Sequence, residues 1–387
     1  MAPSGGSRAP DSSRSLLVVT RALSGGGVQR VTNTLLRCLS RERFRPSLAV
    51  FDRAGPFPAD VPADVPVHDL GRQDPHGILG PAFRLRRVVH ATRPSVVLTL
   101  GRHASLRGLA FVRVLSARVP VVISLHSPPA ASLRTSRHPR VLRLLYRHLY
   151  PHARRIIAAS AGIKGDLESQ LGIPGDLIRV IHNPCEIEHV ERLAIEDPDV
   201  PVEWGIPTLV AAGRLTEQKG FADLLRAVAR VPGCQLLILG EGKDRPALTG
   251  LAAELGISER VVLPGFRPNP FAYMARARAF VLSSLWEGLP LVLLEAMACG
   301  APVVSTDCHS GPGEIITHGI NGLLVPPADP VAMADALTRV LTDPELRARL
   351  ALAARQRARD FAAPAMVAAY EEVLTEIARA SERGAAP

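Results

Sequence analysis

The sequence predicts an α/β protein made of two doubly wound domains in series. The chain has 387 residues, which is enough for two domains of ordinary size. Its composition, 47% apolar and 21% charged, is typical of a globular protein rather than a disordered one. Short apolar runs alternate with helical patterns along nearly the whole length, and this alternation indicates parallel strand–helix units.

The first domain is expected at residues 15–186, after a polar, Gly/Pro/Ser-rich tail at residues 1–14. It opens with a strand at 16–20, a turn through Gly25, Gly26 and Gly27, and a helix at 28–39. Further strands are predicted at 95–100, 119–125 and 155–159. The glycine turn lacks the G-x-G-x-x-G spacing of dinucleotide-binding loops, so hydride chemistry is not expected.

The second domain is expected at residues 187–363, with the proline-rich, acidic stretch 187–207 as the link before it. Strands are predicted at 208–212, 235–239, 260–263, 279–282 and 302–305. A helix is predicted at 290–299, with Pro290 in its first turn and Gly300 just past its end. In doubly wound sheets, ligands bind in the loops at the carboxyl ends of the strands.

Charge and cysteine usage narrow the class of partner. Residues 1–185 hold 27 Lys/Arg against 10 Asp/Glu, and no acidic residue occurs between Asp74 and Asp166. We therefore expect an anionic partner on the first half. The five scattered cysteines show no metal-binding spacing and indicate a reduced, cytoplasmic compartment. No apolar stretch approaches the roughly 18 residues of a membrane-spanning helix.

Two carboxylates stand in the otherwise apolar segment WEGLPLVLLEAMACG, at Glu287 and Glu295. Unpaired buried carboxylates are costly, so both are expected to face a polar ligand or a partner side chain. Glu287 falls in the loop before the helix, where the amides of Gly288 and Leu289 would welcome a phosphate. Carboxylates accept hydrogen bonds from vicinal hydroxyls, so a sugar nucleotide fits. The alternative is a core salt bridge at Glu295 and a surface position for Glu287.

A second cluster, GRLTEQKG at residues 213–220, follows the strand at 208–212 and offers Arg214 and Lys219. Two cations suit a diphosphate leaving group on which negative charge develops, although a solvent-exposed charged loop would show the same sequence pattern. Asp197-Pro-Asp199 spells the Asp-x-Asp metal signature, but it lies in the link and not after a strand. We expect no metal ion and no other cofactor.

The order of several motifs resembles the retaining glycosyltransferases of family 4, which have the GT-B fold of two Rossmann-like domains facing across a cleft. The resemblance covers nearly the whole chain and rests on GRLTEQKG, EGLPLVLLE and AMACGAPVV. It also rests on SGGGVQRV (24–31), VVISLH (121–126), ARRIIAAS (153–160), IRVIHNP (178–184), VLPGF (262–266) and INGLLVPPADP (320–330). By resemblance, a last helix at about 364–380 is expected to return to the first domain, which is the acceptor side.

The resemblance implies a role for each matching position. It assigns the donor diphosphate to Arg214 and Lys219, the ribose to Glu295, and the sugar hydroxyls to Glu287. The resemblance places Gly265 and Phe266 beside the base. It places Gly26 and Gly27 at the turn that approaches the phosphate, and His126 at the cleft near the donor sugar. Without the resemblance, His126 after an apolar strand would be read as a structural histidine. The segment at 308–316, CHSGPGEII, resembles branches that use UDP-sugars and favours UDP over GDP.

The segment at residues 132–155 carries seven arginines and no acidic residue. From Pro139 onward its apolar residues recur at three- and four-residue steps, which predicts a helix with an apolar stripe flanked by cations. Such a helix could lie on an anionic membrane surface, or it could pack on the core with a solvated basic face. Nucleic acid fits poorly, because the segment has no recognised binding motif.

Together, the residues and the resemblance predict a metal-independent transferase that moves a sugar from a nucleotide-diphosphate sugar to an acceptor hydroxyl, and the resemblance implies that the reaction is retaining. The acceptor is expected to be a lipid-linked or cell-envelope glycan. Three alternatives stay open: a soluble small-molecule acceptor, a non-catalytic glycan- or partner-binding scaffold, and an epimerase or phosphorylase of the same fold.

Overall fold

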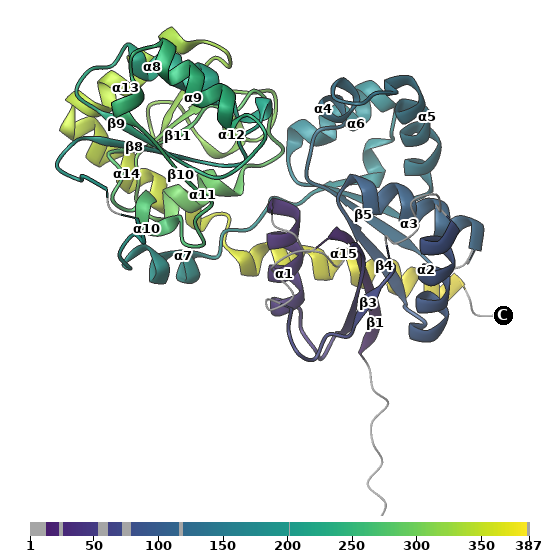
Figure 1. The fold of residues 1–387 in the computed structure, drawn as a ribbon. Coiled ribbons are helices and arrows are strands. Elements are labelled where there is room, and N and C mark those ends of the chain that lie inside the picture. The colour runs from purple at the N-terminus through teal and green to yellow at the C-terminus, as the bar shows by residue number, and fades with distance from the viewer. Residues whose placement is uncertain are drawn as a thin grey trace, which may run out of the picture. The chain divides into compact units, whose positions relative to one another are not determined.

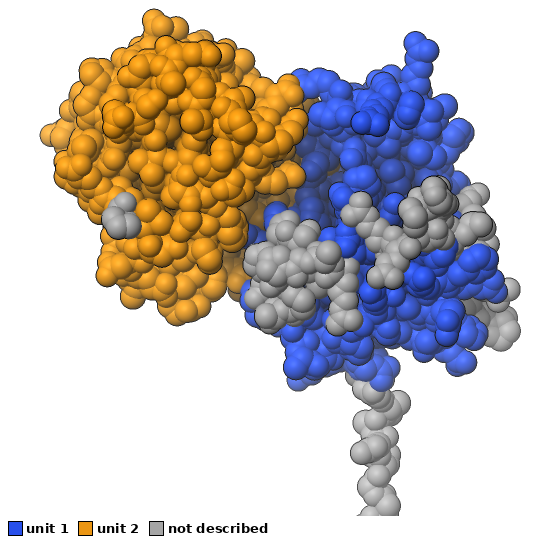
Figure 2. Space-filling model, in the orientation of Figure 1, with its two compact units in different colours: residues 1–158, 166–181, 367–387 blue, residues 159–165, 182–366 orange. Residues whose placement is uncertain are grey.

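The computed structural model describes residues 13–22, 26–52, 61–71, 79–115, 119–200 and 202–384. The chain divides into two compact units (Figures 1 and 2). Unit 1 comprises residues 1–158, 166–181 and 367–387, and unit 2 comprises residues 159–165 and 182–366. The predicted tail at 1–14 lies almost wholly outside the described residues, as does Gly25.

Unit 1 is built on a parallel seven-stranded sheet in the order β3-β2-β1-β4-β5-β6-β7. Figure 1 shows helices on both sides of this sheet. The strands are β1 (Arg14–Ala22), β2 (Phe44–Asp52), β3 (Val67–Asp69), β4 (Val96–Leu100), β5 (Val121–Leu125), β6 (Arg155–Ala158) and β7 (Ile178–Val180). The helices are α1 (Gly27–Cys38), α2 (Leu79–Thr92), α3 (Arg102–Leu115), α4 (Pro129–Arg134), α5 (Pro139–Leu149), the part of α6 (Ala161–Leu171) from residue 166 onward and most of α15 (Ala363–Gly384).

The central strands of unit 1 are buried on both faces, which is why they read as continuous apolar runs in the sequence. The strand β2 was not predicted because it contains Pro46, a residue that rarely occurs inside a sheet. In the structure Pro46 is in register with Leu16 of β1, whereas pairing with β3 begins only at Leu48. The proline therefore lies in the part of β2 that has a strand on one side alone.

Unit 2 has a parallel six-stranded sheet in the order β10-β9-β8-β11-β12-β13. Its strands are β8 (Thr208–Ala212), β9 (Gln235–Leu239), β10 (Val261–Gly265), β11 (Ala279–Leu282), β12 (Val303–Thr306) and β13 (Leu323–Val325). Its helices are α7 (Ile187–Ala194), α8 (Phe221–Ala229), α9 (Arg245–Glu254), α10 (Phe271–Met274), α11 (Leu291–Ala298), α12 (Pro312–Ile315), α13 (Pro330–Thr342) and α14 (Pro344–Arg359). The order reverses at β8, so the crevice expected for a ligand lies at the carboxyl ends of β8 and β11.

Two boundaries differ from those predicted. The chain passes into unit 2 after residue 181, not after 186, and residues 159–165 also belong to unit 2. The predicted link at 187–207 contains the helix α7, whose Ile187 and Val190 are buried three residues apart. The acidic residues and prolines around this short apolar pair hid its helical period in the sequence.

The last helix, α15, runs from Ala363 to Gly384, and its residues from 367 onward belong to unit 1. The buried carboxylate of Glu371 accepts hydrogen bonds from the Ser40 amide (2.8 Å) and the Arg43 guanidinium (2.6 Å). The Tyr370 hydroxyl lies 2.7 Å from Ser124 Oγ at the end of β5. These contacts hold the C-terminal helix to the sheet that the N-terminal strand begins.

Among the residues that the structure describes, no helix combines the length and the apolar character needed to cross a membrane.

Candidate functional site

The predicted donor residues of unit 2 gather at the carboxyl edge of its sheet. The loop with Arg214 and Lys219 follows β8, and the loop with Glu287 follows β11. Since β8 and β11 are hydrogen-bonded neighbours, the two loops emerge side by side. The sheet therefore brings together residues that are 68 positions apart in the sequence.

Backbone and side-chain hydrogen bonds fasten the two loops to one another. The Leu285 amide donates to the Gln218 carbonyl (2.8 Å), and Gln218 Nε2 donates to the Trp286 carbonyl (3.0 Å). Ser283 Oγ donates to the Lys219 carbonyl (2.8 Å). The position of each loop thus depends on the other.

Lys219 and Glu287 form an ion pair at the centre of this edge. Lys219 Nζ lies 2.6 Å from Glu287 Oε1, and both side chains are largely buried. Ser284 Oγ donates to the same oxygen (2.7 Å), and Thr306 Oγ1 fixes Ser284 by donating to its carbonyl (2.6 Å). Both donors use Oε1, so Oε2 accepts no hydrogen bond from the described part of the chain. The alternative of a surface position for Glu287 is wrong, because the residue is only 7% exposed.

The segment from Gly288 to Glu295 carries the second carboxylate. Pro290 is extended (φ −74, ψ 106) and precedes α11, so it lies just outside the helix and not in its first turn as predicted. The carbonyls of Gly288 and Leu289 accept hydrogen bonds from Ser310 (2.9 Å) and Asn183 (2.8 Å). Among the described residues, the amides of Gly288 and Leu289 donate no hydrogen bond to protein. Two anchored carbonyls beside two uncommitted amides give this turn a geometry that suits an anion.

The pKa values of the cysteines around this segment reflect an environment that is shielded from water and negatively charged. Burial, and then Glu287, raises the pKa of Cys308 to about 12. Burial, and then Glu295, raises the pKa of Cys299 to about 12. Glu295 itself is 6% exposed on α11. Two carboxylates held this far from water need cations or hydroxyl donors beside them.

Three further predicted positions lie at the carboxyl ends of β8 and β10, at the same edge of the sheet as the ion pair. Arg214 follows β8 directly, is exposed, and has no ion-pair partner among the described residues. Gly265 ends β10 with φ +93, and Phe266 after it is 58% exposed. An unpaired guanidinium and an exposed aromatic ring at one sheet edge suit a ligand with an anionic end and a flat end.

Gly26, Gly27 and His126 belong to unit 1. Gly26 (φ 117, ψ 171) caps the N-terminus of α1, which Gly27 begins. His126 follows β5 and is half-buried, with its Nε2 3.0 Å from Ser124 Oγ. Ser124 joins His126 to Tyr370 of α15, whose pKa is raised by burial. His126 is therefore held by a serine–tyrosine pair at the carboxyl edge of the unit 1 sheet.

The Asp-x-Asp sequence serves another purpose in the structure. Asp197 pairs with Arg276 (2.7 Å), and Asp199 accepts from the Tyr273 hydroxyl (2.6 Å) and pairs with Arg267 (3.1 Å). The hydrogen bond from Tyr273 lowers the pKa of Asp199. The described residues contain no group of three or more His, Cys, Asp or Glu side chains that could hold a metal ion.

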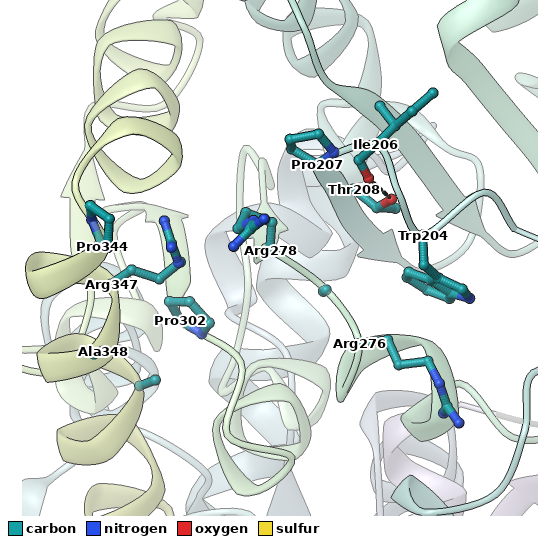
Figure 3. Close-up of a pocket in the computed structure, with 12 residues that line it drawn as sticks. Trp204, Ile206, Pro207, Thr208, Arg276, Arg278, Pro302, Pro344, Arg347 and Ala348 are labelled. Carbon is teal, nitrogen blue, oxygen red and sulfur yellow. Dashed lines mark hydrogen bonds between the residues drawn. The ribbon is translucent and has the colours of Figure 1, made fainter.

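A pocket of about 330 Å³ lies at the opposite edge of the unit 2 sheet (Figure 3). Its lining includes Thr208, Arg278 and Pro302, which begin or precede β8, β11 and β12. This pocket is thus at the amino ends of the strands, and the ion pair is at their carboxyl ends. Concavity and the predicted residues therefore point to different edges of the sheet.

Several residues that position the site were not singled out in the sequence. They are Ser284 and Thr306, which hold Glu287, and Ser310 and Asn183, which hold the turn before α11. Ser160 extends this group, since its Oγ lies 2.9 Å from Ser310 Oγ. The signal available was a hydroxyl or amide residue at the end of a buried apolar run, as in FVLSS at 280–284.

Comparison with protein families matches both units. The family described as "Glycosyl transferases group 1" matches residues 201–357, and "Glycosyltransferase Family 4" matches residues 25–189. The two matches fall in sequence order and together cover most of the chain.

Similar proteins include named glycosyltransferases. The N-acetylgalactosamine-N,N'-diacetylbacillosaminyl-diphospho-undecaprenol 4-alpha-N-acetylgalactosaminyltransferase of Campylobacter jejuni is 33% identical over 61% of this chain and 64% of its own. The lipopolysaccharide core biosynthesis glycosyltransferase LpsE of Rhizobium meliloti is 40% identical over 45% of this chain and 50% of its own. The match thus spans less than two thirds of the length of these relatives.

Among solved structures, Anabaena HepE in complex with UDP superposes with a TM-score of 0.77. The superposition covers 94% of this chain and all of HepE, at 22% identity. This likeness, together with the two parallel sheets, establishes an α/β GT-B fold.

We expect Gly220→Ala to weaken the contact between the loops that follow β8 and β11. Gly220 has φ +59, and a Cβ there would meet the Ser283 carbonyl oxygen at 2.0 Å. Gly233 is the matched control, because its φ is +71 but its Cβ would meet nothing within 4 Å. Denaturant unfolding should show a loss of about 1 kcal/mol for Gly233→Ala and at least about 2 kcal/mol for Gly220→Ala. Equal losses would mean that the contact between the loops has no influence on stability.

Proposed function

Because the chain belongs to the group 1 glycosyltransferases, we propose that it transfers a sugar from a UDP-sugar to a hydroxyl of a lipid-linked or cell-envelope glycan. The transfer retains the configuration at the anomeric carbon and needs no metal ion. The observation that supports this most directly is the Lys219–Glu287 ion pair beside the anion-binding turn before α11.

In this proposal the ion pair is shared between protein and donor. Glu287 Oε2 accepts from the sugar hydroxyls while Oε1 keeps Lys219 and Ser284 in place. Lys219 and Arg214 contact the diphosphate, and the amides of Gly288 and Leu289 complete its surroundings. Positive charge fixed in advance stabilises the leaving group as the bond to the sugar breaks.

The remaining donor contacts follow from position. Glu295 accepts from the ribose hydroxyls, and Gly265 and Phe266 lie beside the base. Gly26, Gly27 and His126 serve the reacting centre from unit 1. A UDP-sugar is favoured because the segment at 308–316 resembles UDP-using branches, and HepE was crystallised with UDP.

Retention follows from attack on the same face. Glu287 is committed to Lys219 and is therefore a poor covalent nucleophile. In the proposed step, the acceptor oxygen bonds to the anomeric carbon on the face from which the phosphate leaves. The acceptor proton passes to an oxygen of the departing phosphate, so no base on the protein is required.

Metal independence is supported by what the acidic residues do. Asp197 and Asp199 are engaged by Arg276, Arg267 and Tyr273, and this leaves them poorly suited to a cation. Lys219, Arg214 and the turn amides supply the charge that a metal ion would bring.

The acceptor is proposed to lie at a membrane surface on the cytoplasmic side. On α5, Val141 and Leu144 are 57% and 56% exposed and Leu145 is 43% exposed, whereas Tyr146 is buried. The alternative of a helix that packs its apolar stripe on the core therefore fits only part of α5. Arg140 and Arg143 are exposed on the same helix. An apolar ridge flanked by arginines complements an anionic lipid surface.

Incubation with a panel of UDP- and GDP-sugars tests the proposed function. We expect slow hydrolysis of one UDP-sugar, release of an α-configured sugar, and full activity in excess EDTA. Release of a β-configured sugar would contradict retention. Activity lost in EDTA and restored by Mn²⁺ would contradict metal independence. Binding of a sugar nucleotide without turnover under any condition would favour a non-catalytic scaffold.

The variant Glu295→Ala tests the proposed contact between Glu295 and the ribose. It should weaken UDP binding by about 1.5–3 kcal/mol, the range for hydrogen bonds to a charged group. Circular dichroism should show an intact fold. Unchanged UDP affinity in the folded variant would remove Glu295 from the ribose site.

Vesicle co-sedimentation tests the membrane surface. We expect binding to anionic vesicles that weakens with salt, and little binding to neutral vesicles. The double variant Arg140→Gln/Arg143→Gln should bind less, whereas Arg86→Gln/Arg87→Gln, which removes two exposed arginines from α2, should behave as wild type. Equal indifference to both vesicle types would favour a soluble acceptor.

A further inference from the structure

A cluster of basic side chains gathers at the carboxyl edge of the unit 1 sheet. Arg21 is next to last in β1, and Arg102 and His103 begin α3 directly after β4. Arg107 follows one turn later on α3. We call these four residues the Arg–His cluster.

The topology places this cluster where ligands bind in doubly wound sheets. The strand order is β3-β2-β1-β4-β5, so the direction of winding reverses between β1 and β4. These two strands are neighbours in register from Leu16↔Val96 to Thr20↔Leu100. Their carboxyl ends therefore open the crevice that such a reversal creates.

Two contacts between described residues hold these side chains. Arg102 Nη2 lies 3.1 Å from His103 Nε2, and the Arg107 guanidinium stacks 5.2 Å above the Phe51 ring. Neither contact supplies negative charge. Among the described carboxylates, Asp52 ends β2 in register with Ala22 of β1, beside Arg21, and Asp69 ends β3 one strand farther away.

The electrostatics of His103 report the same imbalance. Partial burial, and then Arg102, Arg21 and Arg107, lowers the pKa of His103 to about 4. The charged neighbours named among the described residues are all arginines, and they favour the uncharged imidazole at neutral pH. A neutral Nε2 accepts from Arg102 and orients its guanidinium.

We infer that the Arg–His cluster binds a phosphate group carried by the acceptor, an inference that rests on the proposed function. Arginine forks match phosphate oxygens in two-point contacts, and a dianion would relieve the repulsion among three guanidinium groups. The donor diphosphate has its own cations, Arg214 and Lys219, in unit 2. The acceptor is then a glycan attached to its carrier through a phosphate or diphosphate.

The surroundings of the cluster fit a lipid carrier. The helix α3, which bears Arg102 and Arg107, packs against α5. Arg102 also lies close enough to Tyr146 of α5 to oppose the rise in the pKa of that tyrosine that burial causes. The exposed apolar ridge of α5 and the Arg–His cluster thus belong to one packed element pair. A phosphate at a lipid surface would meet both.

Binding of inorganic phosphate to the full chain, measured by calorimetry at constant ionic strength, tests the inference. Saturating UDP is present, so the donor site is filled. We expect phosphate to bind, and Arg102→Gln to weaken it by about 10-fold or more, the least that a hydrogen bond to a charged group contributes. Arg87→Gln, which removes an exposed arginine from α2, should bind phosphate as wild type does. Arg21→Gln replaces Arg102→Gln if that variant does not fold.

A second readout needs no variant. Phosphate in the Arg–His cluster should raise the pKa of His103 from about 4, because an anion favours the charged imidazolium. The shift is followed by NMR of the histidine ring protons.

Three outcomes would overturn the inference. They are no phosphate binding and no shift of His103, equal losses in Arg102→Gln and Arg87→Gln, or phosphate binding that UDP abolishes. The last outcome would assign the cluster to the donor diphosphate. UDP affinity is measured in the same samples, and its absence would instead signal failure of the proposed function.

Discussion

The ion pair between Lys219 and Glu287 is the constraint on which the site of unit 2 depends. A carboxylate that is 7% exposed is costly without a partner, and the partner comes from the loop after the neighbouring strand. The pair therefore requires the register of β8 and β11, the crossed hydrogen bonds between their loops, and the close approach at Gly220. Each of these features helps to neutralise the buried carboxylate of Glu287.

Groups with positive charge lie at the same edge of the unit 2 sheet. The turn before α11 offers amides, while Arg214 offers a guanidinium that no carboxylate of the described chain neutralises. Unit 1 also collects positively charged side chains, in the Arg–His cluster at the reversal between β1 and β4. Both units thus collect charged side chains at the reversal point of a parallel sheet. The division agrees with the sequence, in which the acid-free window from Asp74 to Asp166 falls in the first half.

Much of this was accessible from the sequence, for identifiable reasons. Strands such as β4 and β8 are buried on both faces, so their apolar runs predict them directly. The chemistry of Glu287 and Lys219 was predicted, but their pairing was not, since it depends on which strands are neighbours. The strand β2 and the helix α7 were missed because a proline and a cluster of acids masked short apolar periods. The periodicity of α5 predicted a stripe but could not decide its exposure, which depends on what packs against it.

The most direct test of the account is a double-mutant cycle of Lys219→Met and Glu287→Gln, read by UDP affinity in calorimetry. If the pair holds Lys219 in place for the diphosphate, the two changes are coupled. The account predicts a coupling energy of at least about 1 kcal/mol, because each variant alone already removes most of what the double variant loses. Additive effects within about 0.5 kcal/mol would show that the two residues act independently on the nucleotide, and this would contradict the account.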